Sequence, residues 1–322
     1  MSVDDEITSI VRAAAERLVA DLRGISDQES VDAALDRCIS ALATTNLWGK
    51  ENQGPSYELW RIAGEVLEVG GLQHRARFKP RGYAGDFEML ADFWNHKSVD
   101  SPIGRLFDRY FLKQAAVEAV RARMEWAGAT IAAQCTASPH DEFRVVSIGS
   151  GPGIDLFESA RTLAPSQRPR LRFTLVDMEE AALDAARARL DSIVAQEQIV
   201  VRRENLFRLA TSRKTAEFLS DVDFVLCTGL FDYLADDVAV AQLQLFWNAL
   251  RPGGTLMVGN FAPQNPTRAY MEWLGNWYLI YRDVADLAQL ADAAAIPTEQ
   301  RRIEPERTGC DLFLIATRPE SY

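Results

Sequence analysis

The chain has 322 residues, of which 48% are hydrophobic, and its 35 basic and 46 acidic side chains give a formal net charge of −11. Such a surface repels nucleic acid unless a local basic patch outweighs it, and the richest basic stretch, residues 74–81, is short. The acidic start and the lack of an 18-residue apolar run argue against a secretory signal and a membrane span. We therefore expect a cytoplasmic protein that acts on a small molecule, with neither nucleic acid nor membrane as partner.

The cysteines and histidines do not have the spacing of metal ligands. The cysteines are widely separated and the three histidines form no cluster, so we expect no metal and reduced thiols. These residues are Cys38, Cys135, Cys227, Cys310, His74, His96 and His140.

The first 140 residues are predicted to be mostly helical. Apolar residues at helical spacing and turn residues between them indicate helices at 4–23, 27–43, 57–70, 87–94 and 103–128. We expect residues 1–140 to form a cap over a ligand cleft, a homodimer interface, or both.

Residues 78–88 combine a proline, two glycines, an aromatic ring and two acids. This composition suits a solvated turn between helices, and it also suits a lid whose glycines permit a chain reversal. We favour the lid, with Tyr83 and Asp86 as the residues that reach a substrate.

A buried strand then turns through glycines into a helix at residues 145–155. Glycine lets backbone approach a ligand closely at such a turn. Gly149, Gly151 and Gly153 alone are weak evidence, because nucleotide sites, dinucleotide sites and plain tight turns share this spacing.

A second apolar strand, residues 171–177, ends in Asp177. A carboxylate at the end of the neighbouring strand of a doubly wound sheet can accept both hydroxyls of a ribose. A NAD site would use the same acid, but the loop lacks the Gly-x-Gly-x-x-Gly spacing. Asp155 at the start of the next helix would also repel a pyrophosphate, whereas it suits an ammonium or sulfonium.

The remaining pattern predicts an α/β fold with a doubly wound, mostly parallel sheet of seven strands. Further strands are expected at 198–202, 223–227, 255–260, 298–306 and 309–318, the last two as an antiparallel hairpin at the sheet edge. Helices are expected at 269–281, where aromatic residues follow one helical face, and at 286–295.

Residues 143–318 resemble the class I S-adenosylmethionine (SAM) methyltransferases. The glycine loop, Asp177, the segment 204–207 after the third strand, the segment 223–230 and the Arg-Pro-Gly-Gly turn that starts at Arg251 occur in that family's order. The resemblance implies a Rossmann-like SAM-dependent methyltransferase domain at 141–322, with SAM as cofactor and S-adenosylhomocysteine as product.

The resemblance also implies which residues line the cofactor. The loop would hold the methionine and ribose, the acid the ribose hydroxyls, and the later residues the adenine edge and the methionine. They are Gly149, Ser150, Gly151, Gly153, Asp177, Met178, Asn205, Leu206, Thr228 and Gly229. For Met178 and Leu206, plain core packing is an equal alternative.

Methyl transfer requires the nucleophile, methyl group and sulfur in line, and it can require removal of a proton. The resemblance implies that residues at the end of strand four point at the methyl group and that the region after strand five borders the substrate pocket. The expected catalytic residues are Asp232, Tyr233 and Glu272, and the expected substrate-binding residues are Tyr83, Asp86, Phe231, Asn260, Tyr270 and Trp273.

Two acceptors stay open. Acids and aromatic rings near the cleft suit a guanidinium, and the sequence is similar to bacterial enzymes that N-methylate free arginine in natural-product biosynthesis, of the streptozotocin type. The segments 81–86 and 229–234 also resemble proteins associated with the methyl ester of 3-hydroxypalmitic acid, which implies carboxyl O-methylation. A SAM-binding protein without catalysis is the third hypothesis.

Overall fold

The computed structural model describes residues 3–212 and 215–320, and the chain groups into two compact units. One unit comprises Met1–Glu118 with Pro266–Leu279, and the other comprises Ala119–Asn265 with Ile280–Tyr322. This grouping differs from the predicted division at residue 140. Most of helix α7 (Ala115–Ala137) belongs to the second unit, because Ala127, Ile131 and Cys135 pack in the core of its sheet.

The first unit is helical, as its sequence pattern predicts. Asp27 and Ser101 cap two of its helices by accepting backbone N–H groups of the first turn. The helices are α1 (Val3–Leu22), α2 (Gln28–Ala43), α3 (Gln53–Leu67), α4 (Gly71–Phe78), α5 (Phe87–Trp94) and α6 (Pro102–Leu112), with a short 3-10 helix at Gly49–Asn52.

The predicted helix at 269–281 is wrong beyond Leu274. A π-helical turn spans Tyr270–Leu274, and Asn276 then adopts a left-handed conformation with φ 49°. The Asn276 carbonyl accepts a hydrogen bond from Lys79 Nζ at 2.7 Å. Trp277 packs on Gly85, where a Cβ atom would lie 2.8 Å from the indole. Tertiary contacts therefore override the helical period of the aromatic residues.

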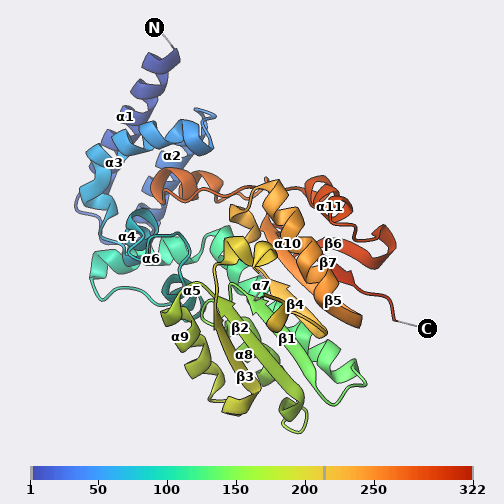
Figure 1. Cartoon of the computed structure of the whole chain (residues 1–322). Helices are drawn as coiled ribbons and strands as arrows, with labels where there is room; N and C mark the ends of the chain where they lie inside the picture. The colour runs from blue at the N-terminus through green and yellow to red at the C-terminus, as the bar shows by residue number, and fades with distance from the viewer. Residues whose placement is uncertain (1–2, 213–214, 321–322) are drawn as a thin grey trace. The chain divides into compact units, whose positions relative to one another are not determined.

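The second unit contains a seven-stranded sheet of order β3-β2-β1-β4-β5-β7-β6 (Figure 1). The first five strands are parallel, and β7 runs antiparallel to both β5 and β6. This confirms the predicted doubly wound sheet. The strands are β1 (Phe143–Ile148), β2 (Leu171–Asp177), β3 (Ile199–Arg203), β4 (Val222–Cys227), β5 (Leu250–Phe261), β6 (Arg301–Pro305) and β7 (Asp311–Thr317).

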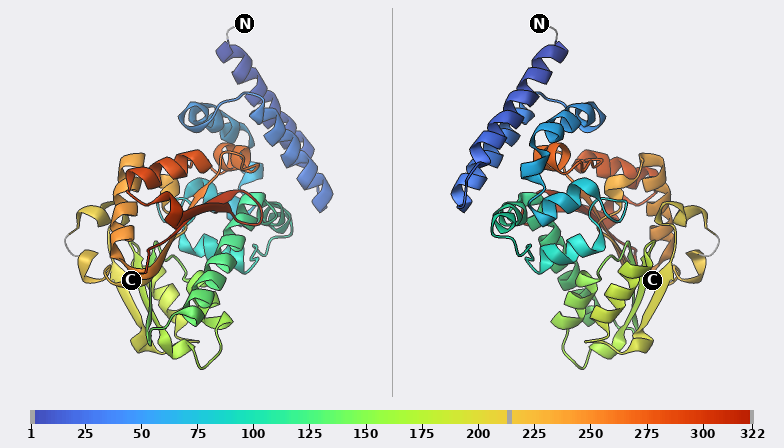
Figure 2. Two further views of the ribbon diagram at one scale, coloured as in Figure 1. Left: turned by 90° about the vertical axis from the view of Figure 1, so that its right-hand side faces the viewer. Right: turned by 90° about the vertical axis from the view of Figure 1, so that its left-hand side faces the viewer.

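Helices cover both faces of this sheet (Figures 1 and 2). Helices α7, α8 (Ile154–Thr162) and α9 (Glu180–Leu190) pack on one face, and α10 (Asp236–Ala249) and α11 (Val284–Ala293) pack on the other. Buried neighbours such as Val145 and Val146 point to opposite faces, which is why these strands are apolar throughout.

One edge of the sheet gathers the ends of several strands. The carboxyl ends of β1, β2, β4 and β5 meet there because these strands are parallel. The amino end of β7 joins them, since Phe261 at the end of β5 pairs with Asp311. Ligands bind at this edge in open α/β sheets.

Among the helices that the structure describes, none combines the length and the apolar character needed to cross a bilayer.

Candidate active site

The glycine loop connects β1 to α8 in a conformation that needs glycine. Gly149, Gly151 and Gly153 have φ angles of 68°, 49° and 64°. The N–H groups of Gly149 and Ser150 both donate to the carbonyl of Val176, at 2.8 and 3.1 Å. A Cβ atom on Gly153 would lie 2.9 Å from the Ala186 side chain of α9. Glycine is therefore also needed at this position because any side chain would clash with that helix.

Asp177 joins the end of β2 to this loop. Its carboxylate is buried and accepts the N–H of Gly151 at 2.9 Å and that of Glu179 at 3.0 Å. Burial raises the pKa of Asp177, and the backbone donors partly oppose that shift. Each oxygen keeps a further lone pair, so the carboxylate can also accept ligand hydroxyls.

The residues around the loop fit a cofactor of the predicted kind. Ser150 Oγ is buried and has no hydrogen-bond partner among the described residues, which is unusual for a native hydroxyl and which a polar ligand would remedy. Beyond the loop, Met178 is 43% exposed at the end of β2, so it is not a core residue.

The next cofactor candidates follow β3. Asn205 is exposed, and its side chain accepts the N–H of Phe207 at 3.1 Å, which caps the 3-10 helix Leu206–Thr211. Leu206 belongs to the hydrophobic core, and it lies 3.6 Å from the position of a Cβ atom on Gly149. Leu206 is thus a core residue that also borders the glycine loop.

Thr228 and Gly229 follow β4 at the same edge of the sheet. Thr228 is half-buried and Gly229 is exposed. A Cβ atom on Gly229 would lie 3.2 Å from Nη2 of Arg123, so this glycine leaves room for the arginine.

Asp232 lies in the loop after β4 and is buried. Its Oδ1 accepts the N–H of Phe261 at 2.7 Å, and its backbone carbonyl accepts the N–H of Ile280 at 2.8 Å. Burial raises the pKa of Asp232, against the attraction of Arg123 and Arg282.

The other predicted residues of this loop differ in exposure. Phe231 is fully buried and packs at 6.4 Å from the Phe246 ring, whereas Tyr233 is 36% exposed.

Arg282 holds this loop in place. Its guanidinium donates to the carbonyls of Phe231 at 2.8 Å and Leu234 at 2.6 Å, and to Asn260 Oδ1 at 2.7 Å. The Asn260 amide in turn donates to the Ile280 carbonyl at 2.9 Å. Arg282 is not among the residues predicted from the sequence, because nothing in the sequence distinguishes a buried arginine from an exposed one.

Both predicted acids of the first unit have partners within that unit. Asp86 caps α5 and receives hydrogen bonds from Arg75 at 2.7 to 3.0 Å. Glu272 is buried and accepts from the Gly49 N–H at 2.7 Å, Asn52 Nδ2 at 2.9 Å and Arg268 Nε at 2.8 Å.

The aromatic candidates of the first unit differ in burial. Tyr270 packs edge-to-face on Tyr110 and Phe111, burial raises its pKa, and Trp273 is fully buried. Tyr83 is 36% exposed. The substrate roles of these residues stay predictions.

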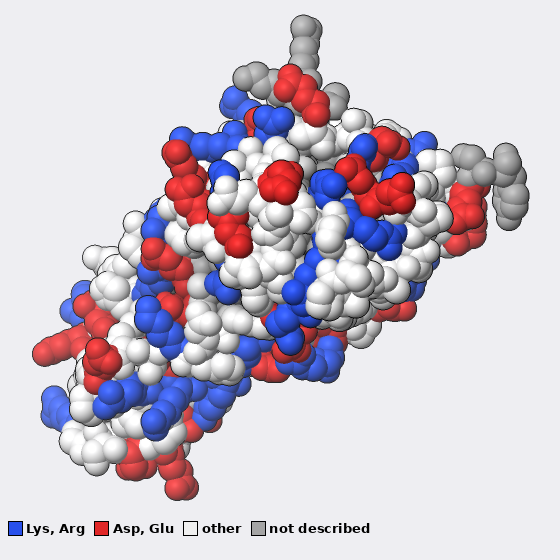
Figure 3. All heavy atoms as spheres, turned by 90° about the horizontal axis from the view of Figure 1, so that it is seen from below, with Lys and Arg blue, Asp and Glu red and all other residues white. Residues whose placement is uncertain are grey.

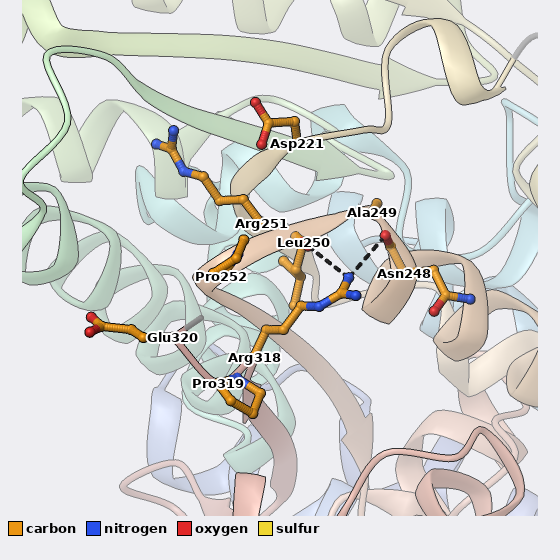
Figure 4. Close-up of a pocket in the computed structure, with 9 residues that line it drawn as sticks. All are labelled: Asp221, Asn248, Ala249, Leu250, Arg251, Pro252, Arg318, Pro319 and Glu320. Carbon is orange, nitrogen blue, oxygen red and sulfur yellow. Dashed lines mark hydrogen bonds between the residues drawn. The ribbon is translucent and has the colours of Figure 1, made fainter. Parts of the chain in front are cut away.

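A cavity of about 470 Å³ lies at the other end of β5 (Figure 4). Arg318 borders it and donates to the carbonyls of Leu250 at 2.9 Å and Asn248 at 3.2 Å. Of the described residues that line this cavity, none is a predicted site residue. It surrounds the start of β5, whereas the candidate site gathers where β5 ends.

Comparison with known proteins agrees with the sheet and the loop. Residues 146–256 match a family model described as a methyltransferase domain. No curated protein matches the chain.

Two solved structures have a similar fold. One, described as a possible exported protein from Bordetella parapertussis, is 18% identical with a TM-score of 0.60, and the alignment covers 99% of this chain and 97% of that one. The other, the CurJ carbon methyltransferase, is 11% identical with a TM-score of 0.53, and the alignment covers 98% and 93%.

Proposed function

We propose that this chain, a SAM-dependent methyltransferase, methylates a nitrogen of a small cationic acceptor, with the guanidinium of free L-arginine in natural-product biosynthesis as the first candidate. The family match spans the glycine loop, Asp177 and Asp232. It confirms the enzyme class and the SAM cofactor predicted from the sequence, and the acceptor is the step beyond it.

Asp232 carries the proposal. A buried carboxylate requires a positive or hydrogen-bonding partner, and the burial that raises the pKa of Asp232 outweighs the attraction of the two nearby arginines. The Phe261 N–H holds Oδ1, which leaves Oδ2 able to accept an N–H group. A cationic acceptor would supply that partner.

The remaining chemistry concerns position. When bound, SAM would supply a methyl group on a sulfonium, and the acceptor nitrogen would take that methyl group in line as the S–CH3 bond breaks and S-adenosylhomocysteine leaves. Asp177 and the glycine loop would hold the cofactor, and Asp232 would orient the acceptor and can receive its proton. The half-exposed Tyr233 ring offers a surface on which a planar guanidinium can stack.

The charge distribution supports a small acceptor. Acidic and basic side chains are interspersed on the face seen in Figure 3, and the net charge is −11. The homodimer through the N-terminal helices and the cytoplasmic location stay predictions.

The test is incubation with labelled SAM and a panel that contains L-arginine and 3-hydroxypalmitic acid, with products identified by mass. We expect an arginine heavier by one or more methyl groups. A methyl ester alone would establish the carboxyl O-methyltransferase instead. SAM binding without transfer to any acceptor would establish the non-catalytic protein.

The variant Asp232→Asn tests whether the carboxylate of Asp232 is needed for arginine turnover. It should reduce arginine turnover by about 30-fold or more, because a charge-assisted hydrogen bond is lost. Asp184→Asn on the exposed face of α9 is the control. Unchanged arginine turnover in Asp232→Asn would contradict the role of that carboxylate.

A further inference from the structure

Arg123 of helix α7 forms an ion pair with a buried acid that lies far away in the sequence. Its Nη1 donates to Asp311 Oδ2 at 3.0 Å, and the two side chains are 7% and 0% exposed. Arg123 also lies over the Phe261 ring, at 5.9 Å from its centroid.

Asp232 and Asp311 approach the same point of the sheet edge. Asp311 is the register partner of Phe261, and the Phe261 N–H donates to Asp232 Oδ1 at 2.7 Å. Both acids therefore lie next to Phe261 at the end of β5. Asp311 is its partner on the neighbouring strand, and Asp232 accepts its N–H group. Neither Arg123 nor Asp311 was among the residues predicted from the sequence.

The cluster has too little positive charge for its acids. The charge of Arg123 acts on three buried carboxylates, Asp155, Asp232 and Asp311. Burial raises the pKa of Asp311 more than Arg123 lowers it, and the charges of Asp232 and Glu306 raise it further.

The other nearby arginines do not make up the difference. Arg282 also acts on Asp232, but it pairs with Asp236 at 2.7 Å. Arg189 also lowers the pKa of Asp155, but it is the smallest of the effects on that carboxyl. Glu306 adds no donor, because its carboxylate accepts from Thr308 and from the N–H groups of Cys310 and Asp311.

Within the part of the chain that the structure describes, two polar atoms of the cluster have no hydrogen-bond partner. Asp311 Oδ1 is a buried acceptor without a donor, and Arg123 Nε is a buried donor without an acceptor. Both side chains are more than nine-tenths buried. Orphaned buried atoms are costly, and a native structure usually satisfies them. A ligand that brings a cationic N–H group and an acceptor oxygen would satisfy both.

We propose that Asp311, together with Asp232, binds a cationic N–H group of the methyl acceptor, an ammonium or a guanidinium, and that Arg123 positions Asp311. The inference rests on the proposed function and names the residues that would select its acceptor. Free amino acids fit this site chemically, since they carry both a cation and carboxylate oxygens.

The strand order favours the acceptor over the cofactor as the source of this cation. Asp177 ends β2 and Asp311 begins β7, with β1, β4 and β5 between them. Four strand spacings of about 4.8 Å separate the two acids by roughly 19 Å along the edge. Asp311 therefore lies well away from the acid that would hold the ribose hydroxyls, which favours the acceptor as the source of the cation.

The test measures SAM binding and acceptor binding separately in Asp311→Asn, with Asp184→Asn as the matched control. Calorimetry with SAM gives the first affinity. Calorimetry with arginine and agmatine in the presence of S-adenosylhomocysteine gives the second, without any need for turnover. We expect the Kd for SAM to stay within about threefold and the Kd for the cations to rise by about 30-fold.

A second measurement uses the wild-type protein, in case Asp311→Asn does not fold. Cation binding should release protons from the buried acids, which calorimetry in two buffers of different ionisation enthalpy detects. Arginine binding without proton release would overturn the proposal.

The outcomes also separate this inference from the proposed function. An equal loss of SAM and cation affinity in Asp311→Asn would assign the cluster to the cofactor and overturn the inference. Cation binding that is unchanged in the variant, or absent from the wild type, would overturn it as well. Cation binding that depends on Asp311 without methylated arginine would support the site and refute arginine methylation.

Discussion

The carboxylate of Asp177 accepts the backbone N–H of Gly151 at 2.9 Å, so the end of β2 holds the glycine loop that follows β1. One buried side chain thus fixes the loop and offers lone pairs to a ligand. The loop conformation and the ligand contact therefore depend on the same residue.

Asp177→Ala should weaken SAM binding by about 100-fold, because it removes a charged acceptor and releases the loop. Calorimetric titration with SAM measures the effect. Asp177→Asn should lose less of the affinity for SAM, since its amide oxygen still accepts the Gly151 N–H. Equal affinities of Asp177→Ala and the wild type would show that the ribose hydroxyls bind elsewhere.

Gly153→Ala should lower the free energy of unfolding by about 3 kcal/mol, through its positive φ and the clash with Ala186. Gly309→Ala is the matched control. Gly309 also has a positive φ, of 77°, but no atom lies within 4 Å of its Cβ position, so that variant should lose only about 1 kcal/mol. Denaturant unfolding of both variants separates the clash from the backbone strain, and equal losses would show that the Ala186 contact is relieved.

Arg282→Met should reduce kcat by about 10-fold or more and leave the Kd for SAM nearly unchanged. The variant leaves the carbonyls of Phe231 and Leu234 without their buried donor, so the loop that carries Asp232 loses its position. Arg282→Lys should also have a low kcat, because an ammonium cannot reproduce the planar set of donors of the guanidinium. A large loss of SAM affinity with normal kcat would contradict this positioning role.

Asp155 should make the protein less stable as the pH rises. Burial raises the pKa of Asp155 to about 6, against 3.8 for the unfolded chain. The native state therefore binds the proton more tightly, so the stabilisation is complete below pH 3.8 and is lost as the pH rises to about 6. The loss amounts to about 3 kcal/mol at most, because one pKa unit corresponds to about 1.4 kcal/mol.

Unfolding of the cofactor-free protein between pH 4 and 7 measures this effect, with Asp155→Asn as the comparison. The variant cannot ionise at this position, so its free energy of unfolding should fall less across that range. Identical pH profiles for the two proteins would show that Asp155 does not titrate in it.

The sheet and the cofactor side of the site were predictable from the sequence, because both depend on neighbouring segments. A strand, a glycine turn and a helix are local patterns. Asp177 is the last residue of the next strand along the chain, and in a doubly wound sheet that strand pairs with the first. The order of the motifs therefore placed Asp177 beside the glycine loop before any tertiary contact was known.

The aromatic segment after β5 shows where sequence periodicity fails. Its spacing predicts one helix over 269–281, yet the structure has a π-helical turn that ends at Leu274. The contacts of Asn276 with Lys79 and of Trp277 with Gly85 decide its path. Such contacts join residues nearly 200 positions apart, so no local pattern reveals them.

The sequence by itself determined the fold class, the glycine loop and its acidic partner, because those features follow from patterns along a few adjacent segments. Only the tertiary structure decided which charged side chains gather at the end of β5, where we propose that the methyl acceptor binds. Asp311 lies near Asp232 because β7 pairs antiparallel with β5, and Arg123 of α7 pairs with Asp311 and acts on Asp232 through its charge. Burial then sets the energy of that cluster, since it makes every unpaired charge and orphaned hydrogen-bonding atom costly.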